Sequence, residues 1–246
     1  MRGSRRRTNQ ARTRIMHPAL KSVAAPVNRD GWPFVMITLV LAVAAGLAWP
    51  PLFWPVAGVA AWVAYFFRDP KRVTPTRPGL VVSPGDGLVS LIATVPPPPE
   101  LSMGDEPRVR ISIFLSIFDV HIQRVPVDGV VGALSYRHGK FVNAALDKAS
   151  EDNERMSVRV DTADGRSIAF VQIAGLVARR IRCDLADGQA VRAGERYGLI
   201  RFGSRVDVYL PPGVAPLVAV GQYAIGGETV FADLNSSEPA REGEER

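Results

Sequence analysis

The chain has 246 residues, 47% of them apolar, enough for one globular domain with appendages and a buried core. Its net charge of +6 is uneven, because residues 1–31 hold eight basic residues and one acidic residue, which leaves −1 for the rest. The body is therefore not a basic platform, and no nucleic-acid partner is expected. The single cysteine, Cys183, excludes a disulfide framework and a cysteine-built zinc site, so no metal is expected and the thiol is taken as a packed residue rather than a nucleophile.

The basic arm, residues 1–31, is followed by a long apolar segment. A basic arm beside apolar sequence suits the surface of an anionic phospholipid membrane. A solvated, disordered tail is the alternative for the arm alone.

No charged residue occurs from position 32 to 67, and all four tryptophans lie in this stretch. Tryptophan favours the boundary between membrane and water. Pro50 and Pro51 divide the stretch into two arms, Pro33–Ala48 and Leu52–Phe67. Each arm would be about 24 Å long as a helix, against roughly 30 Å of hydrocarbon in a bilayer.

Residues 32–68 are therefore interpreted as a membrane-associated helical hairpin that either spans the bilayer or dips into it. Basic residues flank both outer ends, Arg29 before the hairpin and Arg68 after it, which places both ends and the following body on the cytoplasmic side of the cell membrane. The segment is too long and too late for a cleaved signal peptide. A buried core hairpin of a soluble protein is the alternative.

Residues 69–235 alternate strand-like runs with turn signals, which predicts a single β-rich domain of the mainly β or α+β class with short helices. The expected strands are Leu80–Val82, Leu88–Thr94, Val109–Phe114, Gly129–Ser135, Ser157–Thr162, Ser167–Ile173 and Arg205–Leu210. Helical character is expected over Asn143–Lys148 and Ala174–Cys183. The polar segment 236–246 is expected to be disordered.

Several polar segments could carry chemistry, although each has an ordinary structural explanation when taken alone. Asp86 lies in a glycine-flanked turn between two strands, which is common turn chemistry. His121 follows an apolar run and is either a hydrogen-bonded core residue or a general acid or base. Lys140 and Arg155 could hold an anionic group, but the spacing of their segments is not specific.

The dipeptide Gly203-Ser204 interrupts a strand-like run, although Gly-Ser is usually only a turn. Glycine inside a strand indicates a bulge or a strained site. Glycine also has no Cβ to block the Ser204 hydroxyl from the preceding carbonyl, and strain in that peptide would lower the barrier to attack. This setting is what self-cleavage of the backbone would need.

Together and in this order, the segments resemble the phosphatidylserine decarboxylase family in its short bacterial and archaeal form. The resemblance covers roughly residues 66 to 231. It rests on Phe67-Arg68-Asp69-Pro70, Ser83-Pro84-Gly85-Asp86-Gly87, Phe114-Leu115-Ser116, Asp119-Val120-His121, Pro126-Val127-Asp128-Gly129, His138-Gly139-Lys140-Phe141, Asn153-Glu154-Arg155 and Arg201-Phe202-Gly203-Ser204-Arg205-Val206-Asp207.

Two positions depart from the longer bacterial members of this family. Those members carry a second histidine three residues after the first, where this chain has Arg124, and Leu-Gly-Ser-Thr at the cut, where this chain has Phe-Gly-Ser-Arg. The base for self-cleavage is therefore left open, with His121 as the candidate.

The resemblance implies a proenzyme that cuts itself between Gly203 and Ser204 into chains 1–203 and 204–246. The two chains would stay together as a heterodimer, with higher oligomers left open. Ser204 would become a covalent pyruvoyl cofactor that decarboxylates phosphatidylserine to phosphatidylethanolamine through a Schiff base, a lyase reaction of phospholipid biosynthesis. The catalytic residues would be Ser204, His121 and Asp86, with Asp86 as the candidate that orients the histidine, and Lys140 and Arg155 are candidates for the substrate phosphate.

Two other classes of protein compete with this interpretation. Val191–Gly198 resembles the turn of biotinyl and lipoyl carrier domains, so the chain could be a non-enzymatic, membrane-tethered β-module of an adaptor. Such a domain needs a lysine at a tight turn, and no lysine follows Lys148. A serine hydrolase built on Ser204 would lack the Gly-x-Ser-x-Gly turn of one large class.

Overall fold

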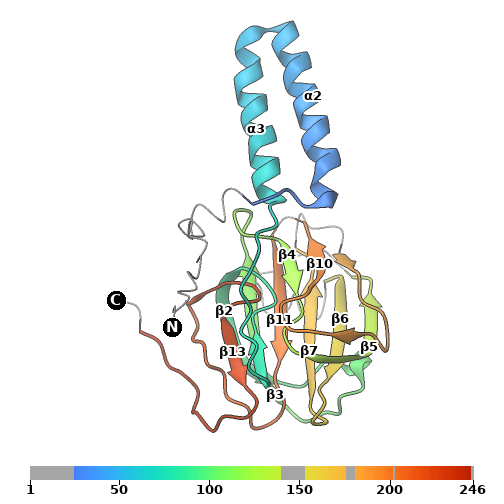
Figure 1. The fold of residues 1–246 in the computed structure, drawn as a ribbon, viewed down its shortest axis with the longest axis vertical. Coiled ribbons are helices and arrows are strands. Elements are labelled where there is room, and N and C mark those ends of the chain that lie inside the picture. Colours follow the sequence, from blue (N-terminus) through green and yellow to red (C-terminus); the bar gives the residue numbers. More distant parts are fainter. Residues whose placement is uncertain (1–24, 140–152, 176–180, 202, 245–246) are drawn as a thin grey trace, which may run out of the picture.

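A computed structural model describes residues 25–139, 153–175, 181–201 and 203–244. Two long helices stand side by side on one end of a β-rich body (Figure 1). The expected class, a mainly β domain preceded by an apolar helical hairpin, is confirmed.

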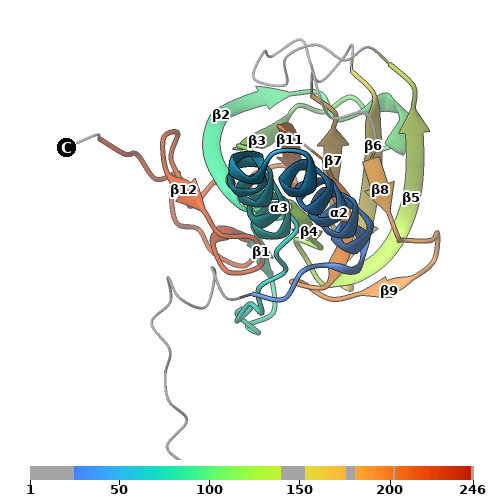
Figure 2. The same cartoon turned by 90° about the horizontal axis from the view of Figure 1, so that it is seen from above.

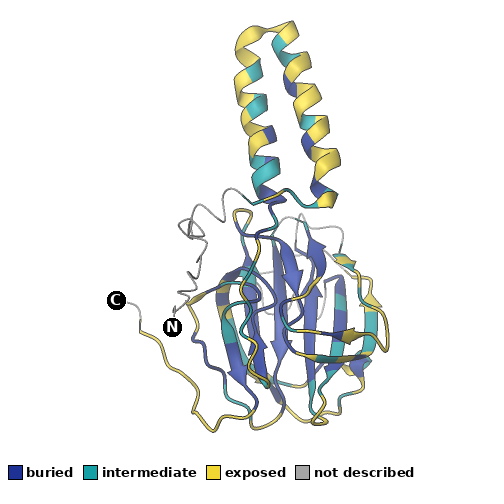
Figure 3. Cartoon of the chain, viewed as in Figure 1, coloured by how far each residue is buried: buried dark blue, intermediate teal, exposed yellow. Residues whose placement is uncertain are grey.

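The break between the two helices of the hairpin lies at consecutive prolines. The hairpin comprises η1 (Arg29–Gly31), α2 (Trp32–Ala48), η2 (Pro50–Leu52) and α3 (Phe53–Phe66). Trp49 is extended (φ −154°, ψ 106°), as the residue before a proline prefers, and this ends α2. Most hairpin side chains are exposed (Figure 3). Within the described residues, one continuous helical stretch, Arg29–Ala48, is long and apolar enough to cross a membrane.

The foot of the hairpin is fastened by the backbone on either side of it. Asn28 N donates a hydrogen bond to the Phe67 carbonyl (2.7 Å), and Asp69 N donates to the Pro26 carbonyl (2.8 Å). The stacked rings of Phe34 and Phe67, 5.4 Å apart, join the first turn of α2 to the end of α3. The hairpin therefore leaves the body from a closed base.

The body is built from three antiparallel sheets. Its strands are β1 (Leu80–Val82), β2 (Gly87–Val95), β3 (Arg108–Leu115), β4 (Ile122–Arg124), β5 (Gly129–Arg137), β6 (Arg155–Asp161), β7 (Ser167–Ile173), β8 (Ile181–Cys183), β9 (Ala190–Val191), β10 (Arg196–Ile200), β11 (Ser204–Tyr209), β12 (Tyr223–Ala224) and β13 (Val230–Asp233), with the short helix η3 (Pro99–Leu101). Eight strands form a sheet in the order β12-β2-β3-β11-β7-β6-β5-β9, which curls into a half-barrel (Figure 2). The smaller sheets are β4-β10-β8 and β1-β13.

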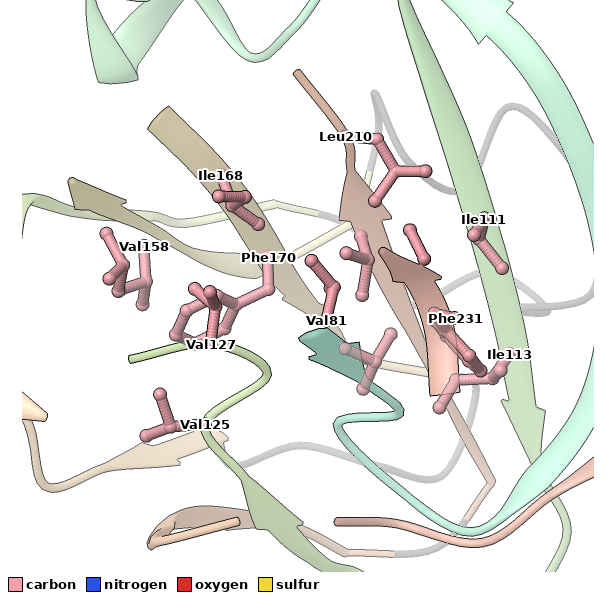
Figure 4. Close-up of a cluster of buried hydrophobic side chains, with 14 of the residues drawn as sticks. Val81, Ile111, Ile113, Val125, Val127, Val158, Ile168, Phe170, Leu210 and Phe231 are labelled. Carbon is pink, nitrogen blue, oxygen red and sulfur yellow. The ribbon is translucent and has the colours of Figure 1, made fainter. Parts of the chain in front are cut away.

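The core fills the space between the curled sheet and the β1-β13 ribbon. Val81 and Phe231 come from the ribbon, and Ile113 and Phe170 come from the sheet (Figure 4). All four are fully buried. Burying such a side chain stabilises the fold by about 1.5–3 kcal/mol, so this core holds the edges of the sheet in fixed register.

The strand predictions are largely confirmed. The bounds of β1 and β7 match, and the ends of β2, β3, β5, β6 and β11 lie within two residues of expectation. The expected helix over Ala174–Cys183 is wrong at its C-terminal end. Residues 181–183 form β8 instead, because pairing with residues 198–200 of β10 satisfies their backbone. Asn143–Lys148 lies outside the described residues.

The C-terminal segment carries no helix or strand in its described part, 236–244. Arg241 nevertheless contacts the body, since its backbone N donates to the Pro216 carbonyl (3.1 Å) and Nη1 donates to the Leu217 carbonyl (3.2 Å). The expected disorder of this tail stays a prediction.

Candidate active site

The start of β2, the end of β3 and the start of β11 lie next to one another at one end of the large sheet. The candidate residues Asp86 and Ser204 lie at two of these strand ends. Ser204 begins β11 and pairs with Leu115, which ends β3. Gly87 begins β2, directly after Asp86, and β2 pairs with the same end of β3. A Cβ on Gly87 would lie 2.3 Å from the Phe114 carbonyl oxygen, so glycine is needed for this close approach. The topology thus brings Asp86 and Ser204 to neighbouring strand ends.

His121 reaches this edge through a second pairing. The connection from β3 to β4 ends at His121, and the connection from β10 to β11 ends just before Ser204. Because β3 pairs with β11 while Ile122 of β4 pairs with Leu199 of β10, the two connections begin and end on paired strands. Residues 83 positions apart are therefore neighbours in topology.

Gly203 has a backbone conformation that favours glycine. Its φ is +60°, in the left-handed region, and a Cβ there would meet nothing within 4 Å. The requirement for glycine is therefore conformational and not one of space. The backbone strain expected at the Gly203–Ser204 peptide from the sequence would be relieved by this glycine and imposed on any other residue.

Two buried polar atoms near this peptide have no hydrogen-bond partner. Ser204 Oγ and His121 Nε2 both lie in fully buried residues, and neither atom has a partner within the described part of the chain. Buried polar groups are normally hydrogen-bonded, and each unmade bond costs about 1–3 kcal/mol. Other buried side-chain atoms of described residues, such as Ser112 Oγ and Tyr197 Oη, also have no partner, so Ser204 and His121 are distinguished by their chemistry and not by this feature alone.

The hydrogen bond at the other ring nitrogen fixes the tautomer of His121. Nδ1 lies 3.0 Å from the backbone carbonyl oxygen of Asp119, which can only accept a hydrogen bond. Nδ1 therefore carries the proton in the neutral ring, which leaves Nε2 with a free lone pair. This is the form that a general base requires.

Burial keeps the His121 ring neutral. Burial is the main cause that lowers the pKa of His121 to about 4; the Arg68 charge acts in the same direction, and Asp119 opposes the shift. The ring of Phe66, at the foot of α3, covers it at 4.1 Å between centroids. At neutral pH the imidazole is thus ready to accept a proton, and the hairpin forms part of its cover.

Asp86 is held by other partners than His121. Its carboxylate accepts from Arg72 Nη2 (2.5 Å) and from Gly226 N (2.8 Å). Burial raises the pKa of Asp86, and the Arg72 charge partly offsets this. The described residues contain no hydrogen bond between Asp86 and His121, so the suggested orienting role of Asp86 is not what this structure displays.

Asp119 and Tyr223 were missed as site residues. Asp119 accepts from Ser116 N (2.7 Å) and from the Tyr223 hydroxyl (2.7 Å), and its backbone carbonyl holds His121. Asp119 stands three residues after Ser116, a spacing that could have signalled the turn. Tyr223 carries no local signal, because its partner lies 104 positions away.

Arg124 takes a structural position. Its Nη1 donates to the Gly194 carbonyl (2.8 Å) and its Nη2 to the Pro70 carbonyl (2.9 Å). Burial lowers the pKa of Arg124 to about 10, which still leaves it charged at neutral pH. It cannot replace a second histidine as a base, which leaves His121 as the candidate.

Neither candidate for binding the substrate phosphate, Lys140 or Arg155, is found next to Ser204 among the described residues. Lys140 lies outside the described residues. Arg155 donates to both carboxylate oxygens of Glu100 (2.8 and 3.0 Å). Ile173 of β7 lies opposite Arg155 in β6 and opposite Arg205 in β11, so these three side chains share one face of the sheet. Ser204 precedes Arg205 and therefore points to the other face. The geometry does not bring Arg155 to the candidate site.

Comparison with known proteins gives one consistent result. Residues 59–232 match the model of the family described as phosphatidylserine decarboxylase. The chain is similar to phosphatidylserine decarboxylase proenzymes of Paramagnetospirillum magneticum (66% identity; 90% of this chain, 92% of the relative), Cereibacter sphaeroides (55%; 92% and 98%) and Rhodospirillum rubrum (55%; 88% and 92%).

Proposed function

The chain belongs to the phosphatidylserine decarboxylase family, and on that premise we propose that it cuts its own backbone between Gly203 and Ser204 and converts Ser204 into a pyruvoyl group. Membership confirms the resemblance seen in the sequence. It makes the chain a carboxy-lyase of phospholipid biosynthesis, produced as a proenzyme and dependent on a serine-derived pyruvoyl group. It also decides against the non-enzymatic adaptor.

The observation that carries the proposal is a pair of buried side-chain atoms with no hydrogen-bond partner among the described residues: Ser204 Oγ, at the start of β11, and His121 Nε2, at the end of the β3–β4 connection. One is a nucleophile beside a glycine in the left-handed region, and the other is a neutral nitrogen with a free lone pair. A serine with a nearby base is the standard arrangement for an activated nucleophile.

Self-cleavage then follows from these residues. His121 Nε2 accepts the proton of the Ser204 hydroxyl, whose oxygen bonds to the Gly203 carbonyl carbon. His121 then gives this proton to the Ser204 nitrogen as the peptide C–N bond breaks, which leaves an ester and a free amine. Nε2, neutral again, takes the Ser204 α-proton, and the Gly203 carboxylate leaves by β-elimination. Chain 1–203 ends there in a carboxylate, and residue 204 loses its nitrogen as ammonia when water adds.

The site fits the resulting group, because a pyruvoyl has no more heavy atoms than the fully buried serine it replaces. When formed, its ketone supplies an electron sink for loss of carbon dioxide from an amino-acid head group. His121, once protonated at Nε2, is placed to return a proton to the product carbon. Phe66 excludes water from the imidazole.

The two chains are expected to remain one molecule after cleavage. Chain 204–246 supplies β11, which pairs with β3 on one side and with β7 on the other, both from chain 1–203. It also supplies β12 and β13. Separation would break the centre of the large sheet, so a stable heterodimer is proposed.

We further propose that the hairpin holds the catalytic domain on the cytoplasmic face of the cell membrane. Arg29 and Lys71 are exposed at its foot, which fits the positive-inside rule. Ile117 and Phe118, in the connection that leads to His121, are 42% and 61% exposed. Arg68 ties this connection to the hairpin foot, since Nη2 donates to the Phe118 carbonyl (2.8 Å). These apolar tips would meet the same bilayer as the hairpin.

The proposed division of the chain follows from these roles. Residues 1–31 form a basic arm for anionic lipid, 32–68 the membrane hairpin, 69–235 the catalytic domain and 236–246 a tail. Phosphatidylserine would be taken directly from the bilayer, where the hairpin holds the domain.

The experiment is a matched pair of serine substitutions in the full chain. Ser204→Ala is expected to leave one intact chain on a denaturing gel and to abolish release of carbon dioxide from phosphatidylserine. Ser236→Ala, in the exposed tail, is the control and is expected to be processed and active. Normal processing of Ser204→Ala would refute the proposed cleavage site.

A further inference from the structure

A polar cleft lies between the hairpin foot and the end of β10. It has a volume of about 480 Å³ and is lined by Asp30, Ile181, Arg182, Cys183, Leu199 and Arg201. Because Asp30 of η1, directly before α2, lines the cleft, the cleft lies where the apolar hairpin meets the body. Trp32, which is half exposed at this level, is a residue type that favours the membrane–water boundary.

The two arginines of this cleft differ in how far their charge is satisfied. Arg182 forms ion pairs with both Asp30 and Asp184. Arg201 forms no ion pair or hydrogen bond within the described part of the chain, and its guanidinium stacks over the Phe34 ring at 4.8 Å. The Phe34 ring contacts one face of the guanidinium, and no described residue accepts a hydrogen bond from its N–H donors.

Arg201 is also close to the reacting residue along the chain. Arg201 lies three positions before Ser204, so their Cα atoms are at most about 11 Å apart. In a serine phospholipid only a few covalent bonds separate the amine from the phosphorus atom. A lipid whose amine reaches residue 204 must therefore bring its phosphodiester into this neighbourhood.

We propose that Arg201 binds the phosphodiester of the phospholipid substrate in this cleft, with Leu199 and Ile181 contacting the glycerol region. The inference deepens the proposed function and rests on it. A guanidinium suits a phosphate because its donors form a fork that matches two oxygens. Asp30, the one acidic residue lining the cleft, is neutralised by Arg182.

Binding can be tested without self-cleavage. In the full-length Ser204→Ala proenzyme, isothermal titration would compare dihexanoyl phosphatidylserine with dihexanoylglycerol, which lacks the phosphate. Adding Arg201→Gln is expected to weaken the phosphatidylserine affinity on the order of tenfold or more and to leave the dihexanoylglycerol affinity unchanged. Arg201→Lys should retain an intermediate affinity. Arg192→Gln, at an exposed arginine of the β9–β10 turn, is the matched control and should bind as the parent does.

Three results would overturn the proposal: an unchanged phosphatidylserine affinity in Arg201→Gln, an equal loss for both lipids, or an equal loss in Arg192→Gln. A vesicle arm separates substrate binding from general attraction to an anionic membrane. If Arg201→Gln weakens only association with phosphatidylglycerol vesicles, the residue serves membrane docking and the proposal is wrong. Processing of Arg201→Gln with Ser204 intact reports on the proposed function independently.

Discussion

The hairpin and the β body use the same apolar residue types in opposite ways. In the hairpin, Leu47 is 84% exposed and Val40 64%, whereas in the body Ile113 and Val208 are fully buried. The body buries its apolar side chains in its own core, whereas the hairpin leaves most of its apolar side chains exposed. An exposed apolar patch of this size on a folded protein marks a surface that something else covers.

The exception to this contrast is the hairpin foot. Phe66 and Phe67 are as buried as the core, and they pack with Val120, Ile122 and Leu199 of the body. The same cluster adjoins His121. The part of the hairpin that touches protein is thus the part that covers the candidate base, which couples the anchor to the chemistry.

The largest expected effect separates the two regions by stability. Ile113→Ala should lower the free energy of unfolding of the body by about 2–5 kcal/mol, because it leaves a cavity. Leu41→Ala, exposed on α2, should change it by less than about 0.5 kcal/mol. Amide hydrogen exchange of peptides from β3 and β11, measured in detergent, would report on the body, whereas tryptophan fluorescence would report on the hairpin, which holds all four tryptophans. Equal losses would contradict the contrast.

The next effect concerns the membrane. Val40→Lys, at the middle of α2, should weaken insertion by about 2.5–3.5 kcal/mol, because a charge would enter the hydrocarbon. Flotation with phospholipid vesicles measures this, and Val40→Leu is the control. Processing into two chains should persist in Val40→Lys. Unchanged flotation would mean that this helix is covered by protein and not by lipid.

A third effect is pH-dependent and belongs to the buried histidine. The pKa of His121 falls from 6.5 to about 4 on folding, so between these values the unfolded chain binds the proton and the folded chain does not. The contribution of His121 to the free energy of unfolding should be at its maximum above pH 6.5. It should fall by up to about 3 kcal/mol as the pH drops to 4. His121→Gln should lack this component. Parallel pH profiles for the two proteins would contradict the neutral, buried imidazole.

The smallest effect tests the positioning of His121 by the second chain. Tyr223→Phe removes the hydroxyl that donates to Asp119, and should cost about 1 kcal/mol of stability. Tyr136→Phe, which removes a hydroxyl bonded to Glu154, is the matched control. Only Tyr223→Phe should slow self-cleavage, measured by pulse-chase, because only Asp119 holds the imidazole. Equal cleavage rates would reduce Tyr223 to a structural role.

The sequence predicted those elements whose conformation depends on residues close in the chain. Alternation and turn residues located β1 and β7, and Pro50 with Pro51 placed the break in the hairpin. β8 was mistaken for helix because its three residues become a strand only by pairing with β10. Short strands such as β12 depend in the same way on distant partners.

In the candidate site too, residues in local motifs could be predicted, whereas contacts between distant parts of the chain could not. Ser204, His121 and Asp86 could be selected from motifs, and the topology brings their strand ends together. The sequence could not reveal that Arg155 faces the other side of the sheet, since the register of β6, β7 and β11 decides this. Nor could it reveal the cover of Phe66 over His121, which joins residues 55 positions apart through tertiary packing.

The central claim, self-cleavage at Ser204, is tested most directly by denaturing mass spectrometry of the purified wild-type protein. The account predicts two chains, one ending at Gly203 and one beginning at position 204, with the second lighter than a serine-initiated peptide by the mass change that replaces the amine with a ketone. A single intact chain in active, membrane-extracted material would contradict it.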